Sequence, residues 1–215
     1  AIGHHPTLPD TWLLGTQDNG TNLSSPESCS RILDGDGFHA FFDASIPGRL
    51  YASAYYGLLY RSDDGGRTLQ NIANYFQSSG PNELGAWQTP FQLHPAMNGR
   101  IVAAKKSLHF SDDGGDTWTT IGGMGTVRST ALALSDIDVD VALVSKNAQL
   151  YWKSSASTSF QPVTALPGEH IGDVAIVSGT TENWWVGFGS YLDSTQVWYT
   201  SDAGQSWENR SGGLP

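Results

Sequence analysis

The sequence contains little lysine, one cysteine and no long apolar run. Four of the 215 residues are lysine, and the formal charge is −10, from 11 basic and 21 acidic side chains. A surface of this sign repels nucleic acid and anionic membranes, so we expect neither as a partner. Cys29 cannot form an internal disulfide, and no segment approaches the roughly 18 apolar residues of a membrane span. These absences predict an acidic protein without disulfide or membrane span.

Glycine, proline and tryptophan are plentiful instead. The chain has 25 glycines, 10 prolines and 8 tryptophans. This mixture favours many short strands joined by tight turns over long helices. Composition therefore predicts an all-β protein and leaves its function open.

One motif recurs along the chain. It reads Ser/Thr-x-Asp-x-Gly-x-Ser/Thr followed by a large apolar residue, and it stands at 62–69, 111–118 and 200–207. We call these segments boxes one, two and three. A degenerate copy occupies 153–160, where Ser155 and Ser157 replace the aspartate and the glycine. Because the copies recur every 42 to 49 residues, the chain consists of repeated units.

The segments around each box repeat as well. Two apolar strands separated by a polar turn precede a third strand, and the box connects this third strand to a fourth. Four-stranded units of this length are typical of propeller blades. The sequence predicts an all-β propeller of antiparallel blades, five of them in this chain. Their bounds are about 1–37, 38–88, 89–129, 130–171 and 172–215.

The box residues are interpreted as structural. Serine, threonine and aspartate side chains can bond the backbone amides of their own turn, and glycine takes conformations closed to other residues. The calcium alternative lacks the distal glutamate and a third oxygen ligand, and the histidines show no metal spacing, so we expect no metal or cofactor. The predicted structural residues are Ser62, Asp64, Gly66, Ser111, Asp113, Gly115, Trp118, Asp202, Gly204 and Trp207.

The boxes resemble the Asp-box, or bacterial neuraminidase repeat. Sialidases, sortilin-type receptors, xyloglucan hydrolases and photosystem II assembly-factor propellers carry this repeat. Locally, Gly15–Thr21 and Gly35–Phe38 are similar to secreted bacterial propellers without a demonstrated activity. The resemblance implies a propeller with six to ten blades, so we expect further blades to follow Pro215. It also implies an extracellular, periplasmic or cell-surface location.

Propeller topology divides the connections between two ends of each blade. The boxes lie at one end, and ligands in the resembled family bind at the other. We therefore predict a ligand site on the connections at that second end, with Tyr75, Phe76 and other aromatic rings as platforms for a sugar. The connection 74–88 is the longest, and its composition suggests a flexible lid or an interaction arm. The predicted ligand-binding residues are Asp18, Asn19, Asp36, His39, Tyr55, Tyr56, Trp87, Arg128 and His170.

Two functions remain open. The first is a non-enzymatic binding or scaffold module for a glycan or protein partner, which the residues favour. The second is a glycoside hydrolase resembling xyloglucan hydrolases, with Asp18 and Asp36 as candidate catalytic carboxylates, although each also fits an ordinary tight turn. A sialidase is disfavoured because only Arg128 of the required arginine triad falls at the ligand end.

Overall fold

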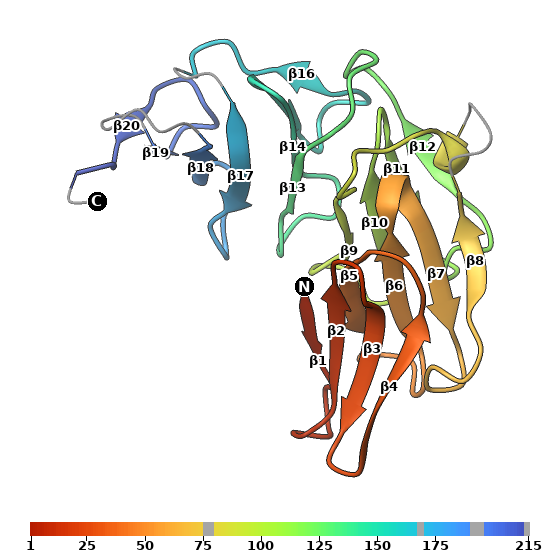
Figure 1. Cartoon of the computed structure of the whole chain (residues 1–215). Helices are drawn as coiled ribbons and strands as arrows, with labels where there is room; N and C mark the ends of the chain where they lie inside the picture. Colours follow the sequence, from red (N-terminus) through yellow and green to blue (C-terminus); the bar gives the residue numbers. More distant parts are fainter. Residues whose placement is uncertain (75–79, 167–169, 190–195, 213–215) are drawn as a thin grey trace. The chain divides into compact units, whose positions relative to one another are not determined.

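The computed structural model describes residues 1–74, 80–166, 170–189 and 196–212. Its strands form five four-stranded antiparallel sheets, and within each sheet the strands are neighbours in chain order (Figure 1). We name the sheets A to E along the chain. The prediction of an all-β chain built from four-stranded blades is confirmed.

The strand bounds are as follows. Sheet A has β1 (Ile2–His4), β2 (Trp12–Thr16), β3 (Gly20–Ser25) and β4 (Ser28–Leu33). Sheet B has β5 (Gly37–Phe42), β6 (Leu50–Ala54), β7 (Leu58–Ser62) and β8 (Gln70–Ala73). Sheet C has β9 (Phe91–Leu93), β10 (Ile101–Ala104), β11 (Leu108–Ser111) and β12 (Thr119–Ile121). Sheet D has β13 (Ala131–Leu134), β14 (Ala142–Lys146), β15 (Gln149–Lys153) and β16 (Gln161–Pro162). Sheet E has β17 (Ile171–Ile176), β18 (Trp184–Phe188), β19 (Val197–Thr200) and β20 (Glu208–Asn209). The 3-10 turns are η1 (Tyr55–Gly57) and η2 (Gly80–Asn82).

The chain divides into two compact units. The first contains residues 1–93 and 98–120, with sheets A and B and all of sheet C except Ile121. The second contains residues 94–97 and 121–215, with sheets D and E.

In the first unit, apolar side chains fill the spaces between successive sheets. Leu13 of sheet A packs with Ala40 and Leu50 of sheet B. Between sheets B and C, Tyr51 and Phe91 are fully buried, with their ring centroids 6.0 Å apart. Burial of such side chains contributes roughly 1.5–3 kcal/mol each, so the sheet interfaces form the core.

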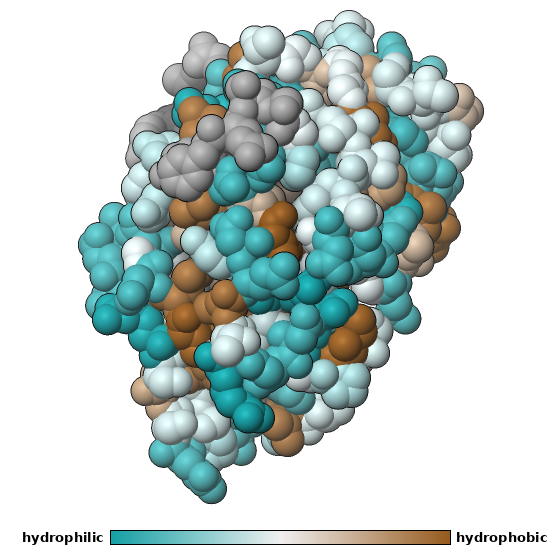
Figure 2. Space-filling model, turned by 90° about the vertical axis from the view of Figure 1, so that its right-hand side faces the viewer, coloured by the Kyte–Doolittle hydropathy of each residue, from teal (hydrophilic) through white to brown (hydrophobic). Residues whose placement is uncertain are grey.

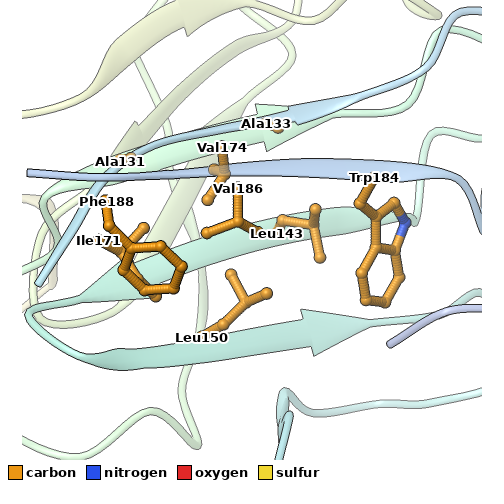
Figure 3. Packing of buried hydrophobic residues seen from close by; sticks show 9 residues of the cluster. All are labelled: Ala131, Ala133, Leu143, Leu150, Ile171, Val174, Trp184, Val186 and Phe188. Atoms are coloured by element: carbon orange, nitrogen blue, oxygen red, sulfur yellow. The ribbon is translucent and has the colours of Figure 1, made fainter. Parts of the chain in front are cut away.

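The second unit is built on the same plan. Nine buried side chains of sheets D and E form one cluster (Figure 3). Leu143 and Leu150 of sheet D point toward Val186 of sheet E, and Trp184 closes one end of the cluster. Trp184 is fully buried, and its indole Nε1 donates to Thr181 O at 2.9 Å.

Each box closes its own hairpin turn. In box two, the Ser111 hydroxyl donates to Asp113 Oδ1 at 2.7 Å, and Asp113 accepts from Thr117 N at 2.8 Å and Thr117 Oγ1 at 2.5 Å. The Gly115 amide donates back to Ser111 Oγ at 2.7 Å. Boxes one and three repeat all four bonds with Asp64 and Asp202. The predicted turn bonding is therefore present in all three boxes.

These bonds keep the box carboxylates ionised. Hydrogen bonds from the Thr68 side chain and amide, and from Ser62, lower the pKa of Asp64 to about 2. Equivalent bonds from Ser206 and Thr200 lower the pKa of Asp202 to about 2, and those from Thr117 and Ser111 lower the pKa of Asp113 still further.

The boxes also fasten neighbouring sheets together. Trp118 Nε1 donates to Ile72 O of sheet B at 3.2 Å as well as to Gly115 O. Buried Arg61 of β7 reaches box two, where its guanidinium donates to Gly114 O at 2.8 Å and to Asp116 at 3.0 Å. Because guanidinium groups bond acceptors in a fixed fork, Arg61 fixes how box two lies against sheet B.

Sheets A and D, which lack full boxes, use other contacts. In sheet D, buried Lys153 stands where a box has its first serine or threonine, and it donates to Asp140 O at 3.0 Å. This bond ties the β15–β16 turn to the β13–β14 turn. In sheet A a tight turn at Pro26–Glu27 joins β3 to β4.

Hydrophobic residues do not merge into one exposed surface on the face drawn in Figure 2. They lie in separate patches between hydrophilic residues. Among the described residues, no helix has the length and apolar character needed to cross a membrane.

Candidate functional site

Five connections of the first unit meet at the end opposite the boxes. They are 17–19, 34–36, 55–57, 74–90 and 105–107, and we call the surface they form the loop face. Hydrogen bonds and ring contacts link each connection to the next, as set out below. The structure thus brings Asp18, Asp36, Tyr55, Tyr56 and Trp87 onto one surface.

The two candidate carboxylates are neighbours, but one of them already has a backbone partner. Asp36 Oδ1 accepts a hydrogen bond from the Asp18 amide at 2.7 Å. Covalent geometry then keeps the two carboxyl carbons within about 8 Å of each other. Asp18 has a φ of 61°, a left-handed conformation that aspartate tolerates at tight turns. The bond connects the β2–β3 turn of sheet A to the A–B linkage at 34–36.

Aromatic rings gather beside this pair. The rings of Tyr55 and Trp87 stack with centroids 5.7 Å apart and an interplanar angle of 17°. Tyr56 and Phe38 meet the Trp87 ring edge-on, at 5.0 and 6.0 Å. Trp87 is 46% exposed, whereas Tyr55 and Tyr56 are half-buried. We call Phe38, Tyr55, Tyr56 and Trp87 the aromatic platform; Phe38 is the member that the predicted site omits.

The backbone around Tyr56 is strained. Its φ is 58°, which is unusual for a bulky residue. Two bonds hold this conformation: the Tyr56 amide donates to Trp87 O, and the Gly85 amide donates to Tyr56 O, both at 3.1 Å. Strain of this kind costs on the order of 1–3 kcal/mol and concentrates at functional sites.

Lys105 departs from its prediction as a surface cation. Lys105 and Lys106 were expected to form a basic patch at the ligand end, yet Lys105 is fully buried. Its ammonium donates to Gly57 O at 2.8 Å, to Asn74 O at 3.1 Å and to Pro81 O. Burial lowers the pKa of Lys105 to about 8, opposed by the charge of Glu83, so the side chain remains protonated at neutral pH.

Glu83 fastens the same long connection to β11. Its Oε1 accepts from the Ser107 amide at 2.7 Å and lies 2.9 Å from His109 Nε2. Burial alone would raise the pKa of Glu83, but the bonds from His109 and Ser107 outweigh it and hold the pKa below its ordinary value. Because an ionised carboxylate only accepts, His109 Nε2 carries a proton, and Nδ1 faces Thr120 Oγ1 at 2.9 Å. Residues 80–90 are therefore anchored, contrary to the expectation of a flexible lid.

The remaining predicted site residues lie elsewhere. His39 belongs to β5, and its amide donates to Ser53 Oγ at 2.9 Å. Asn19 stays within its own turn, where Nδ2 donates to Gln17 O at 3.2 Å. Arg128 and His170 are exposed residues of the second unit. Tyr75 and Phe76 lie outside the described residues.

The metal question can be put to the described ranges only. Within them, no group of three or more histidine, cysteine, aspartate or glutamate side chains is arranged to hold an ion.

Comparisons with known proteins bear on the fold. No protein-family model matches the sequence, and no curated protein matches it. Solved structures do match. An ancestral GH74 enzyme is 16% identical, with a TM-score of 0.73 over 97% of this chain and 32% of its own. The GH74 xyloglucanase from Xanthomonas campestris is 16% identical, with a TM-score of 0.71 over 97% of this chain and 38% of its own. YCF48 bound to a D1 peptide is 14% identical, with a TM-score of 0.64 over 97% of this chain and 66% of its own.

These structures are propellers, so the five sheets are propeller blades. The chain spans about a third of the length of the GH74 enzymes. At such low identity the likeness shows the fold alone.

Proposed function

We propose that this chain is a non-enzymatic binding module whose loop face receives a glycan or a protein segment. The observation that carries the proposal is the aromatic platform, in which the half-exposed Trp87 is supported by three other rings. Aromatic rings hold the apolar faces of sugars and the side chains of peptides, and large rigid rings dominate the energy of such contacts. Two fold neighbours match these ligand classes by name, one a xyloglucanase and one bound to a peptide.

The carboxylate pair supports binding over hydrolysis. Asp36 spends one oxygen on the Asp18 amide, which is the role of a latch between two connections. A latch requires only an acceptor, whereas general acid or base chemistry requires an ionisable carboxyl. The alternative, a glycoside hydrolase using Asp18 and Asp36, is favoured by their proximity, because catalytic carboxyls are separated by about 5–9.5 Å.

Binding can be tested by titrating soluble xyloglucan, a panel of other glycans and a peptide library. We expect Trp87→Ala to weaken the binding that is found by at least about tenfold, as for a central aromatic contact. Trp185→Ala is the matched control, because Trp185 is 39% exposed and lies in the second unit. Equal effects of the two substitutions would contradict the assignment of the site.

Hydrolysis can be tested by reducing-end release from the same glycans. The proposal expects no turnover. Turnover that Asp18→Asn and Asp36→Asn both abolish would establish the hydrolase instead. Asp36→Asn keeps an acceptor for the Asp18 amide and Asp36→Ala does not, so a latch predicts that only the alanine variant disturbs the loop face.

We place the protein outside the cytoplasm, supported by the Asp-box resemblance and the low lysine content. We also propose that the five blades belong to a larger propeller, since each GH74 neighbour contains about three times the matched length. Fractionation of the native cell tests the location. All of the protein in the cytoplasmic fraction would refute it.

A further inference from the structure

We propose that Lys105 is a positioning residue for the aromatic platform: it sets the relative placement of Tyr56 and Trp87 without contacting the ligand. This inference rests on the proposed function for its ligand, but its geometry stands independently. The ammonium of Lys105 bonds three carbonyls from two connections, and each of these connections carries part of the platform.

The first connection is η1. Lys105 Nζ donates to Gly57 O, directly after Tyr56. The contact is close, because a Cβ on Gly57 would lie 2.6 Å from Lys105 Cε, and Gly57 has a φ of 84°. Glycine at 57 thus leaves room for the lysine stem to pass under the turn that presents the two tyrosines.

The second connection is 74–90, which carries Trp87. Lys105 Nζ donates to Asn74 O at 3.1 Å and to Pro81 O, and so gathers two points of this connection at one atom. Glu83 adds a second attachment through the Ser107 amide. Sheet C therefore holds the connection from below, through the turn between β10 and β11.

One cation suits this task for a physical reason. An ammonium has three donors and no acceptor, so it can satisfy three converging carbonyls that no backbone amide reaches. Bonds to charged donors are also stronger than neutral ones, and a buried site excludes competing water. Its loss leaves three carbonyls in a dry site and frees both connections to move apart.

The test compares Lys105→Met with Lys106→Met, its sequence neighbour. The readout is the near-UV circular dichroism of Trp87, isolated as the difference between each protein and the same protein carrying Trp87→Phe. We expect the wild-type and Lys106→Met difference bands to agree, and the Lys105→Met band to be lost while the far-UV strand signal persists. Acrylamide quenching of the Trp87 emission should rise in Lys105→Met alone. Lys105→Gln, which keeps a shorter neutral donor, should give an intermediate band.

The outcomes separate this inference from the proposed function. Unchanged Trp87 signals in a folded Lys105 variant overturn the positioning role. Loss of folding in both Lys105 variants, with Lys106→Met folded, shows a role in the sheet itself and also overturns it. If the Trp87 signals change but wild-type protein binds neither soluble xyloglucan nor any other glycan or peptide tested, the positioning role stands and the proposed function fails.

Discussion

The fit of box two against sheet B can be tested with one methyl group. Gly115 has a φ of 103°, and a Cβ built on it would lie 2.7 Å from Ile72 Cδ1 and 2.9 Å from Ile72 Cβ. Gly65, in box one, has a φ of 73° but no atom within 4 Å of the same added carbon. Alanine at 115 therefore meets both backbone strain and crowding, whereas alanine at 65 meets backbone strain alone.

The two costs can be separated. Left-handed backbone costs a non-glycine residue roughly 1–2 kcal/mol. Overpacking a filled interface costs about 1–3 kcal/mol more. We expect Gly65→Ala to lower the free energy of unfolding of the first unit by about 1–2 kcal/mol, and Gly115→Ala by about 2–5 kcal/mol.

The assay is equilibrium urea unfolding followed by tryptophan fluorescence. Trp118 is a local reporter, because its indole bonds Gly115 O and Ile72 O across the interface concerned. A double-mutant cycle with Ile72→Ala isolates the clash, since that change removes Cδ1. The double variant should lose less stability than the sum of the single ones. Equal costs at 65 and 115, or strict additivity with Ile72→Ala, would refute the reasoning.

Three further predictions concern charged groups. Asp113→Ala should lower the melting temperature of the first unit by a few degrees and leave glycan or peptide binding unchanged, because box two lies at the opposite end of the sheets from the loop face; calorimetry and titration check this. The box carboxylates have lowered pKa values, so their stabilisation should be complete above about pH 4 and should be lost as the pH falls toward 2, measured by acid titration of unfolding. Lys105 has a lowered pKa, so the unfolded chain holds more protons between pH 8 and 10.5; wild-type stability should therefore rise with pH over this window relative to Lys105→Met in urea unfolding.

The sequence predicts the repeating elements well because their determinants are local. A box needs bonds between residues two to four apart, as with Ser62, Asp64 and Thr68, and strand pairing within a blade joins neighbouring segments. Such contacts leave a pattern that recurs at every copy. The same topology places Asp18, Tyr55 and Trp87 on one surface, as the order of connections implies.

Contacts between distant segments leave no such pattern. Lys105 stands beside Lys106 in the sequence and resembles it, yet Lys105 bonds carbonyls 24 to 48 residues away. Asp136 was interpreted as part of a solvated edge, but its carboxylate accepts from the Ser178 hydroxyl and the Gly179 amide, which lowers the pKa of Asp136. Only the folded arrangement decides whether an isolated charge faces water or a neighbouring turn.

The self-contained bonding of the boxes bears on how the chain folds. Every side-chain bond of Asp64, Asp113 and Asp202 closes within four residues, while Arg61 waits for partners about 50 residues further along. Short loops close in well under a microsecond and long ones pay more entropy, so hairpins with boxes can form before their sheets dock. During synthesis each blade can complete its outer turn as it emerges, and Arg61 then docks box two on a sheet that is already formed. The order of blades along the chain would thus become the order of assembly.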